Sequence, residues 1–199
     1  MKALFDVPAP AKLNLFLHVI GRRADGYHLL QSVFMLIDWC DTLHFERRDD
    51  GRIVRHDLSA PLPADDLITR AAALLQQATG ARSGADISID KRIPAQAGMG
   101  GGSSDAASTL LALNRLWNLK LPLPQLEALG LQLGADVPFF LRGHNAWVEG
   151  VGEQITPIAM SPARFCVIKP ATGVDTASIF RHPQLERATK AATIAVFAA

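Results

Sequence analysis

The chain has 199 residues, of which 49% are hydrophobic and 20% charged, a composition typical of a globular protein with a core of its own. Its 20 basic and 19 acidic residues nearly cancel to a formal charge of +1, so we expect a small-molecule partner rather than a nucleic acid or an anionic membrane. Cys40 and Cys166 show no metal-binding spacing, which predicts free buried thiols, and no apolar run reaches the ~18 residues of a membrane span, which predicts a cytoplasmic protein.

The N-terminal part of the chain has the alternating pattern of an antiparallel sheet. Residues 11–20 predict a half-buried strand, on which Lys12 and Asn14 point the same way because they are two positions apart. The predicted apolar face consists of Leu13, Leu15, Leu17 and Val19. The segment GRRADGYH (21–28) predicts a charged turn, and SVFMLID and TLHFE predict two further strands.

The rest of the chain contains both helix-like and strand-like sequence patterns. LITRAAALLQQAT predicts a helix, with Asp65 or Asp66 as its N-cap and Gly80 at its C-terminal end. ADISIDKRI predicts a strand, whereas SSDAASTLLALNRLWNL and PLPQLEALGLQLG predict two more helices. VPFFLRG, NAWVEG and RFCVIKP resemble strands. Strands interspersed with a few helices favour an α+β fold over a regularly alternating parallel sheet.

A glycine-rich loop, PAQAGMGGGSSDAA (94–107), stands between a predicted strand and a helix opening at Ser103 and Ser104. Glycines allow positive φ and close backbone approach, so backbone N–H groups at a helix start predict an anion site, most naturally for phosphate. A flexible tether or a plain helix cap is the alternative. The loop matches neither GxxxxGK[ST] nor GxGxxG, and the chain contains no HRD or DFG triplet of protein kinases.

Three motifs together carry a resemblance to a known family. PAPAKLNLFLHVIGRRADGYHLLQS, PAQAGMGGGSSDAAS and LGADVPFFLRG, in this order, resemble the GHMP small-molecule kinases, over residues 8 to about 182. The AKLNL and ADGYH text is similar to the branch that phosphorylates 4-diphosphocytidyl-2-C-methyl-D-erythritol in the non-mevalonate isoprenoid pathway. The resemblance implies a two-domain fold, with a complete ATP-binding domain over 1–155 and a C-terminal domain only begun over 156–199. The apolar end, AATIAVFAA, is then expected to be exposed.

The resemblance also implies roles in phosphoryl transfer from ATP with Mg²⁺. Asp136 would be the catalytic base, and Lys12 would keep it ionised and favour charge on the attacking oxygen. A turn residue and a solvated lysine are the ordinary alternatives. Asp66, where the family usually has asparagine, and Lys91 are expected at the nucleotide, and Ser104 is a candidate magnesium ligand. The expected triphosphate-binding residues are Pro94, Ala95, Gln96, Ala97, Gly98, Met99, Gly100, Gly101, Gly102, Ser103 and Ser104.

For the acceptor, the resemblance assigns Asn14, Tyr27, His28 and Phe180 to the diphosphocytidyl end. Tyr27 would stack on the pyrimidine, His28 would bond the base edge, and Phe180 would close the stack from the other side. Packing of these residues within the protein's own turn and core is the alternative interpretation.

Three hypotheses of function remain open from the sequence. The first is an active ATP-dependent kinase for 4-diphosphocytidyl-2-C-methyl-D-erythritol. The second is a relative that binds nucleotide or substrate without turnover, because the family's third glycine motif is not found in this chain. The third is another GHMP kinase, acting on a sugar or homoserine, which the base-stacking residues disfavour.

Overall fold

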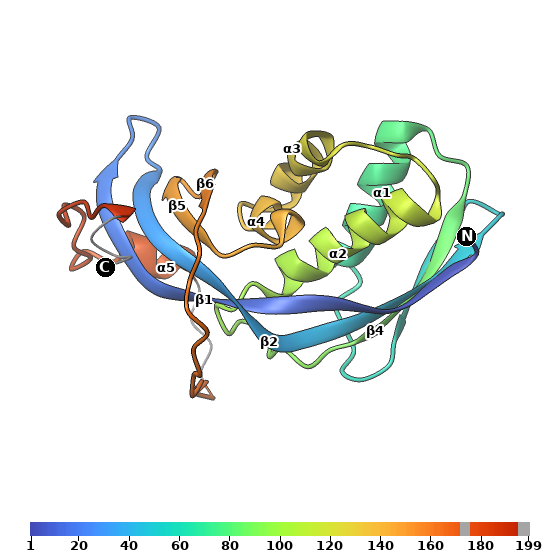
Figure 1. Ribbon diagram of the computed structural model, residues 1–199, viewed down its shortest axis with the longest axis horizontal. Helices are drawn as coiled ribbons and strands as arrows, with labels where there is room; N and C mark the ends of the chain where they lie inside the picture. The colour runs from blue at the N-terminus through green and yellow to red at the C-terminus, as the bar shows by residue number, and fades with distance from the viewer. Residues whose placement is uncertain (172–175, 195–199) are drawn as a thin grey trace. The chain divides into compact units, whose positions relative to one another are not determined.

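The computed structural model describes residues 1–171 and 176–194, and it divides the chain into two units (Figure 1). Unit 1 comprises Met1–Ala11, Ile37–Pro94 and Gly100–Gly143, and unit 2 comprises Lys12–Leu36, Ala95–Met99 and His144–Ala199. Each unit is therefore built from separate stretches of sequence, and the long strands β1 (Ala3–Arg22) and β2 (His28–Arg48) contribute to both. The predicted boundary after residue 155 remains a prediction.

Unit 1 combines strands and helices in two layers. The C-terminal half of β2 pairs antiparallel with β4 (Gly84–Asp90), which pairs in parallel with β3 (Ile53–Asp57). In Figure 1 the four helices of this unit lie on one side of these strands. They are α1 (Leu67–Thr79), α2 (Gly101–Leu116), α3 (Leu123–Leu133) and α4 (Val137–Arg142).

The helix α2 is the centre of the unit 1 core, because ten of its residues are buried and it contacts α1, α3 and α4. Leu110 and Leu113 on this helix, like Phe45 on β2 and Ile87 on β4, have no measurable exposure. Trp117, directly after α2, donates its indole N–H to the carbonyl of Gly84 at 3.1 Å. Because this hydrogen bond satisfies the indole N–H, the large ring can be buried, and it fixes α2 to the strand layer.

Unit 2 is a smaller antiparallel arrangement. The N-terminal half of β2 pairs with β5 (Ala146–Gly150), and β5 pairs with β6 (Gln154–Pro157) through a tight turn. Trp147 is buried there and packs 5.5 Å from Phe16 between ring centres. The last described helix is α5 (Thr176–Arg181). The pairing confirms the α+β class, with antiparallel contacts predominating over the single parallel pair found in the described part of the chain.

The helix ends were predicted well where a side chain or a glycine decides them. Asp66 is the N-cap of α1 and accepts hydrogen bonds from the backbone of Ile68 and Thr69, and Gly80 ends the helix in the left-handed conformation. The predicted start of α2 at Ser103 and Ser104 was wrong, since the helix begins at Gly101 and its N-cap, Gly100, uses no side chain. The glycines there already allow the helix to start two residues earlier.

Two strand predictions need correction because strands were judged from local pattern alone. SVFMLID and TLHFE form one continuous strand, β2, which pairs with β5 along its first half and with β4 along its second. On β1, Leu17 of the predicted apolar face is 42% exposed, whereas Lys12 of the opposite face is only 4% exposed. Long strands that change partner do not keep one face buried throughout.

VPFFLRG is a helix, α4, not a strand. A short apolar run does not distinguish the two, and here Pro138 fits the first turn of a helix while Gly143 ends it at a φ of 66°. Val137 through Leu141 are all buried, and α4 contacts α2 and α3, so the segment is apolar on every side.

The C-terminal text differs from prediction in two further respects. RFCVIKP forms no strand, and its Phe165 and Ile168 are 42% and 85% exposed. Both cysteines are free, as predicted, but neither is fully buried, since Cys40 is half-buried and Cys166 is exposed. The predicted exposed end AATIAVFAA falls partly on residues 195–199, outside the described residues. Of the helices in the described ranges, none combines the length and the apolar character needed to cross a bilayer.

Candidate active site

The glycine-rich loop has the backbone that its sequence predicts. Gly98 and Gly100 have φ values of 70° and 71°, and Gln96 has a φ of 55°, which is unusual for a residue with a side chain. Space is open around Gly98, where an added Cβ would meet nothing within 4 Å. The loop runs directly into α2, whose first-turn N–H groups lack intrahelical partners. This start of a sixteen-residue helix is suited to an anion.

The two serines of the motif differ in exposure. Ser103 is half-buried, whereas Ser104 is completely buried and donates its backbone N–H to the carbonyl of Gly100 at 2.9 Å. Among the described residues the hydroxyl of Ser104 has no hydrogen-bond partner. A buried hydroxyl without a partner is costly, so this oxygen is a reasonable acceptor or donor for a group that the chain itself lacks.

Lys91, Asp41 and Asp105 form a cluster that we call the buried charge cluster. The Lys91 ammonium forms ion pairs with Asp41 and, at 2.7 Å, with Asp105. Asp41 also accepts hydrogen bonds from the backbone N–H groups of Arg92 and Ile93, at 2.6 and 2.8 Å. The cluster thus joins β2, the residue directly after β4 and the N-terminal part of α2 within unit 1.

Burial dominates the electrostatics of this cluster. Burial raises the pKa of Asp105 to about 7. The attraction of Lys91 lowers this pKa, whereas the negative charge of Asp41 raises it further. Burial lowers the pKa of Lys91, but the two carboxylates outweigh it and raise that pKa overall. The ammonium expected at the nucleotide is therefore engaged by the protein's own carboxylates, and its contact with a nucleotide remains a prediction.

Asp66 is engaged by the protein as well. Besides capping α1, its carboxylate accepts from the hydroxyl of Thr69 at 2.7 Å and forms an ion pair with Arg55. Its side chain is only 7% exposed. The acid in place of the family's asparagine is thus held by a cationic neighbour, and its predicted role at the adenosine is untested.

Lys12 lies on β1 in unit 2, with contacts on several sides. Its ammonium donates to Asn14 at 2.6 Å, as their shared face predicts, and lies 4.0 Å from the ring centre of Phe34. Its backbone N–H donates to the carbonyl of Met99 at 2.9 Å, which links β1 to the glycine-rich loop. A nearly buried lysine held in this way is a fixed positive charge.

Asp136 lies in unit 1, at the junction of α3 and α4. It follows the glycine that ends α3, Gly134, as predicted, and it takes the N-cap position of α4 without using its side chain as a cap. The carboxylate is therefore not committed to holding the helix end, in contrast to Asp66.

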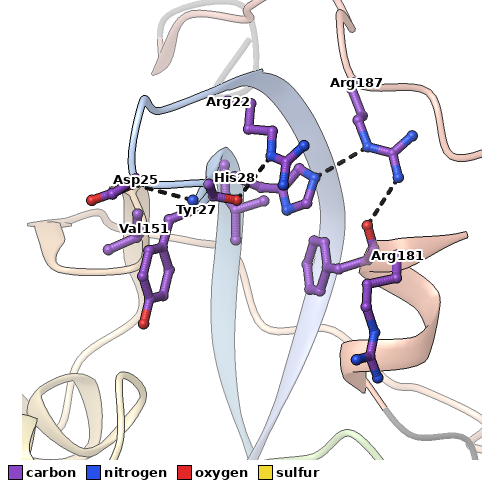
Figure 2. A pocket seen from close by; sticks show the side chains of 10 residues that line it. Arg22, Asp25, Tyr27, His28, Val151, Arg181 and Arg187 are labelled. Atoms are coloured by element: carbon purple, nitrogen blue, oxygen red, sulfur yellow. Dashed lines mark hydrogen bonds between the residues drawn. The ribbon is translucent and has the colours of Figure 1, made fainter.

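Unit 2 contains a cavity of about 860 Å³, the unit 2 cavity, which gathers three of the four residues predicted at the acceptor (Figure 2). The turn after β1 and the start of β2 contribute Arg22, Asp25, Tyr27 and His28. The C-terminal segment contributes Phe180, Arg181 and Arg187. Asn14 does not line it, since its side chain lies at Lys12 instead.

The rings in this cavity form one stacked pair, and the predicted sandwich around a pyrimidine remains a prediction. Phe180 stacks on His28, with ring centres 5.2 Å apart and an interplanar angle of 27°, whereas Tyr27 is 66% exposed. The backbone of Tyr27 is fixed by the turn, because its N–H donates to Asp25 and its carbonyl accepts from Arg23. Most of Tyr27 is therefore accessible to an aromatic ligand.

The sequence did not reveal Arg187, which holds the cavity wall together. Its Nε donates to Nε2 of His28 at 3.2 Å, and its other nitrogens donate to the carbonyls of Phe180, His182 and Leu185. Burial, followed by the positive charges of Arg187 and Arg22, lowers the pKa of His28. His28 is thus neutral at pH 7.

A second cavity of unit 2, of about 410 Å³, lies beside the glycine-rich loop. It is lined by Gln96 through Met99 of the loop and by Val167 through Pro170, together with Leu17, Ile179 and Phe180. Phe180 borders both cavities of this unit. One aromatic side chain therefore contributes both to the cavity beside the loop and to the cavity of the residues expected to bind a base.

Comparisons with known proteins show which family the chain is similar to. Residues 66–144 match the family described as GHMP kinases N terminal domain. The whole chain is 69% identical to the 4-diphosphocytidyl-2-C-methyl-D-erythritol kinase of Methylibium petroleiphilum and covers 69% of its length. It is 68% identical to the kinase of the same name from Paracidovorax citrulli, covering 71% of it.

Solved structures give the same result. A crystal structure of 4-(cytidine 5'-diphospho)-2C-methyl-D-erythritol kinase superposes with a TM-score of 0.76 at 42% identity, covering 87% of this chain and 62% of that one. A homoserine kinase from Cytophaga hutchinsonii superposes with a TM-score of 0.60 at 16% identity, over 79% of this chain and 52% of that one, and shares the fold alone.

Proposed function

Because the chain belongs to the 4-diphosphocytidyl-2-C-methyl-D-erythritol kinase family of the GHMP kinases, we propose that it transfers a phosphoryl group from ATP to the 2-hydroxyl of 4-diphosphocytidyl-2-C-methyl-D-erythritol. Such a kinase serves the non-mevalonate route to isoprenoid precursors. A cytoplasmic location, as expected from the sequence, belongs to the same proposal.

The observation that supports the acceptor most strongly is the unit 2 cavity. Tyr27, His28 and Phe180 all line it, although Phe180 is more than 150 positions from the other two in sequence. The exposed ring of Tyr27 and the phenyl ring of Phe180, which stacks on the His28 imidazole, offer stacking, and the imidazole offers a hydrogen bond to a pyrimidine. The arginines at the same cavity suit the diphosphate that joins this base to the sugar alcohol.

Asp136 and Lys12 are the residues that we assign to chemistry. The carboxylate of Asp136 takes the proton of the acceptor hydroxyl as that oxygen attacks phosphorus. Lys12 supplies a fixed positive charge that favours the ionised forms of the carboxylate and of the attacking oxygen. The small exposure of Lys12 supports this role, because a charge screened by little water acts more strongly.

The loop fits the phosphates of ATP, which supplies the phosphoryl group. Positive φ at Gly98 and Gly100, open space at Gly98 and the start of α2 together make a cradle for an anion. Mg²⁺ would neutralise phosphate charge when bound, and the unpartnered hydroxyl of Ser104 is the protein oxygen that we propose for it. Lys91 and Asp66 would act at the nucleoside end.

The test is release of ADP by the full chain with ATP, Mg²⁺ and the acceptor, beside the Asp136→Asn variant. We expect acceptor-dependent turnover and a kcat lower by ~10²–10⁴-fold in the variant. Asp65→Asn is the matched control, because this side chain is 85% exposed at the surface and should leave kcat unchanged.

The remaining outcomes separate the other hypotheses. Folded chain that binds ATP or the acceptor without turnover would reduce the proposal to a binding protein. Turnover with homoserine or a sugar, and none with the cytidine compound, would assign the chain to another GHMP activity. Turnover that survives in Asp136→Asn would remove Asp136 from the role of base.

A further inference from the structure

Arg187 is placed to control which nitrogen of His28 carries a proton. We propose that Arg187 is a positioning residue that holds neutral His28 with its proton on Nδ1, and that this arrangement selects cytosine over uracil in the unit 2 cavity. The inference rests on the proposed function, because it assumes that the cavity binds the nucleobase of the acceptor.

The chemistry of the contact fixes the tautomer. A guanidinium has N–H donors and no acceptor, so Nε2 of His28 must present its lone pair to Nε of Arg187, 3.2 Å away. In a neutral imidazole only one nitrogen then remains for the proton, and that is Nδ1. A free histidine side chain favours the other neutral tautomer, with the proton on Nε2. The contact with Arg187 therefore reverses the usual preference.

The surrounding charges keep His28 neutral, which the tautomer requires. Arg22 and Arg187 flank it, and both lower its pKa together with burial. The other charged groups at the cavity are Asp25, in the same turn as Arg22, and Arg181 at the end of α5. Asp25 forms an ion pair with Arg23 at 2.6 Å, which neutralises its negative charge.

Arg187 is itself held rigidly, so it is a reliable template for the imidazole. Its guanidinium donates to the carbonyls of Phe180 at 3.0 Å, His182 at 2.8 Å and Leu185 at 3.0 Å. In Figure 2 it bridges His28, on β2, and the C-terminal end of α5. The stacking of Phe180 on His28 then prevents the ring from turning.

The resulting donor distinguishes the two pyrimidines. Among the described residues, none accepts a hydrogen bond from Nδ1 of His28, so this N–H is available to a ligand in the cavity. Cytosine offers two acceptors on its pairing edge, N3 and O2, whereas uracil carries a hydrogen on N3. A fixed N–H facing the N3–H of uracil leaves two donors opposed, and such mismatches are strongly rejected.

The experiment is calorimetric titration of the full chain with cytidine diphosphate and with uridine diphosphate, for the wild type, Arg187→Met and Arg187→Lys. We expect the wild type to prefer the cytidine compound by at least about tenfold. Arg187→Met should bring the two affinities to within about threefold, chiefly by weakening cytidine binding, whereas Arg187→Lys, whose ammonium is also a donor without an acceptor, should keep part of the preference. Arg164→Met, a change at an exposed arginine of the same unit, should keep the wild-type preference.

Two further measurements separate positioning from a merely structural role. In ¹⁵N spectra, His28 of the wild type should show a protonated Nδ1, and Arg187→Met should shift it toward a protonated Nε2. Thermal melts of each variant establish that it is folded.

Every outcome bears on the proposal. An unchanged preference in folded Arg187→Met, a wild type that binds both compounds equally, or a wild-type His28 protonated on Nε2 would each overturn it. Folded wild type that binds neither compound would instead overturn the proposed function of the cavity, and the inference with it.

Discussion

The buried charge cluster of unit 1 and the cavity of unit 2 use charged side chains in opposite ways. In the cluster, Lys91 meets Asp41 and Asp105 with little exposure, and the charges neutralise one another. In the cavity, Arg22, Arg181 and Arg187 share a wall with one acid, Asp25, and Tyr27 is exposed. Charges of the cluster largely balance one another, whereas positive side chains outnumber negative ones at the cavity, beside an exposed aromatic ring.

The difference indicates that some residues in or near the sequence motifs stabilise the fold, whereas others are available for binding. Lys91 precedes the glycine-rich loop and Asp105 lies near the end of that motif, within α2, so their ion pair links the end of β4 to α2. Substitutions in the cluster should therefore change stability first. Substitutions in the cavity should change ligand affinity and leave stability largely intact.

The largest effect is expected for Lys91→Met. Removing the ammonium leaves two buried carboxylates without their cation, and breaking a buried pair in this way costs about 3–5 kcal/mol of unfolding free energy. Urea unfolding at pH 8 measures this loss. Arg92→Met is the control, because Arg92 is mostly exposed and its pair with Asp90 should contribute at most about 1 kcal/mol. A loss of similar size in both variants would contradict the distinct role of the cluster.

In the cavity, Phe180→Ala should act on binding instead. Base–aromatic stacking is worth about 1–3 kcal/mol, so affinity for cytidine diphosphate should fall roughly 5- to 150-fold, as calorimetry would measure. Phe165→Ala removes an exposed ring of the same unit and should leave the affinity unchanged. Equal affinities for the wild type and Phe180→Ala would mean that Phe180 serves only to pack against His28.

The pH dependence of stability probes the cluster with a smaller change. The pKa of Asp105 is raised to about 7, so between pH ~4 and ~7 the folded chain holds a proton that the unfolded chain has lost. Wild-type stability therefore falls as pH rises through this window. Asp105→Asn, which has no proton to lose, should be more stable than the wild type at pH 8 by about 1–2 kcal/mol.

Unfolding in urea at pH 5, 6, 7 and 8 follows this difference, which should shrink toward pH 5, where the wild-type carboxyl is protonated. Asp49→Asn, at a side chain 93% exposed, should show no such trend. A variant less stable than the wild type at pH 8 would reverse the expected sign and would mean that ionised Asp105 strengthens the cluster.

Much of the fold followed from sequence because local chemistry decides it. Asp66 and Gly80 delimit α1 through a cap and a left-handed residue, both of which are visible in the text. The glycine-rich loop was recognised in the same way, from residues that permit its backbone. The strand prediction for VPFFLRG was wrong because an apolar run of that length is buried in either a helix or a strand. Only the contacts of this segment with α2 and α3 decide which of the two forms.

The site was predictable only where a motif carried it. Tyr27 and His28 stand together in ADGYH, but Arg187 lies 159 positions after His28, and no spacing rule joins them. Lys91 and Asp41 are likewise 50 positions apart, so the ion pair that occupies Lys91 had no local signal. Charges that meet only through the fold have to be seen in the structure.

The smallest effect is expected at the glycine-rich loop, and it tests whether the loop behaves like the cavity or like the cluster. Gly98 and Gly143 have φ values of 70° and 66°, and a Cβ added at either would meet nothing within 4 Å. Alanine at either position should thus cost the same backbone strain, about 1 kcal/mol of unfolding free energy.

Only Gly98 lies where phosphate is expected, since Gly143 ends α4. We therefore expect Gly98→Ala to raise the KM for ATP about fivefold, because close backbone approach is lost, and Gly143→Ala to leave it unchanged. Steady-state kinetics beside urea unfolding measures both quantities on the same samples. Equal KM values for ATP in Gly98→Ala and Gly143→Ala would mean that Gly98 serves the fold, as the buried charge cluster does. A rise in Gly98→Ala alone would mean that the loop, like the unit 2 cavity, serves ligand binding.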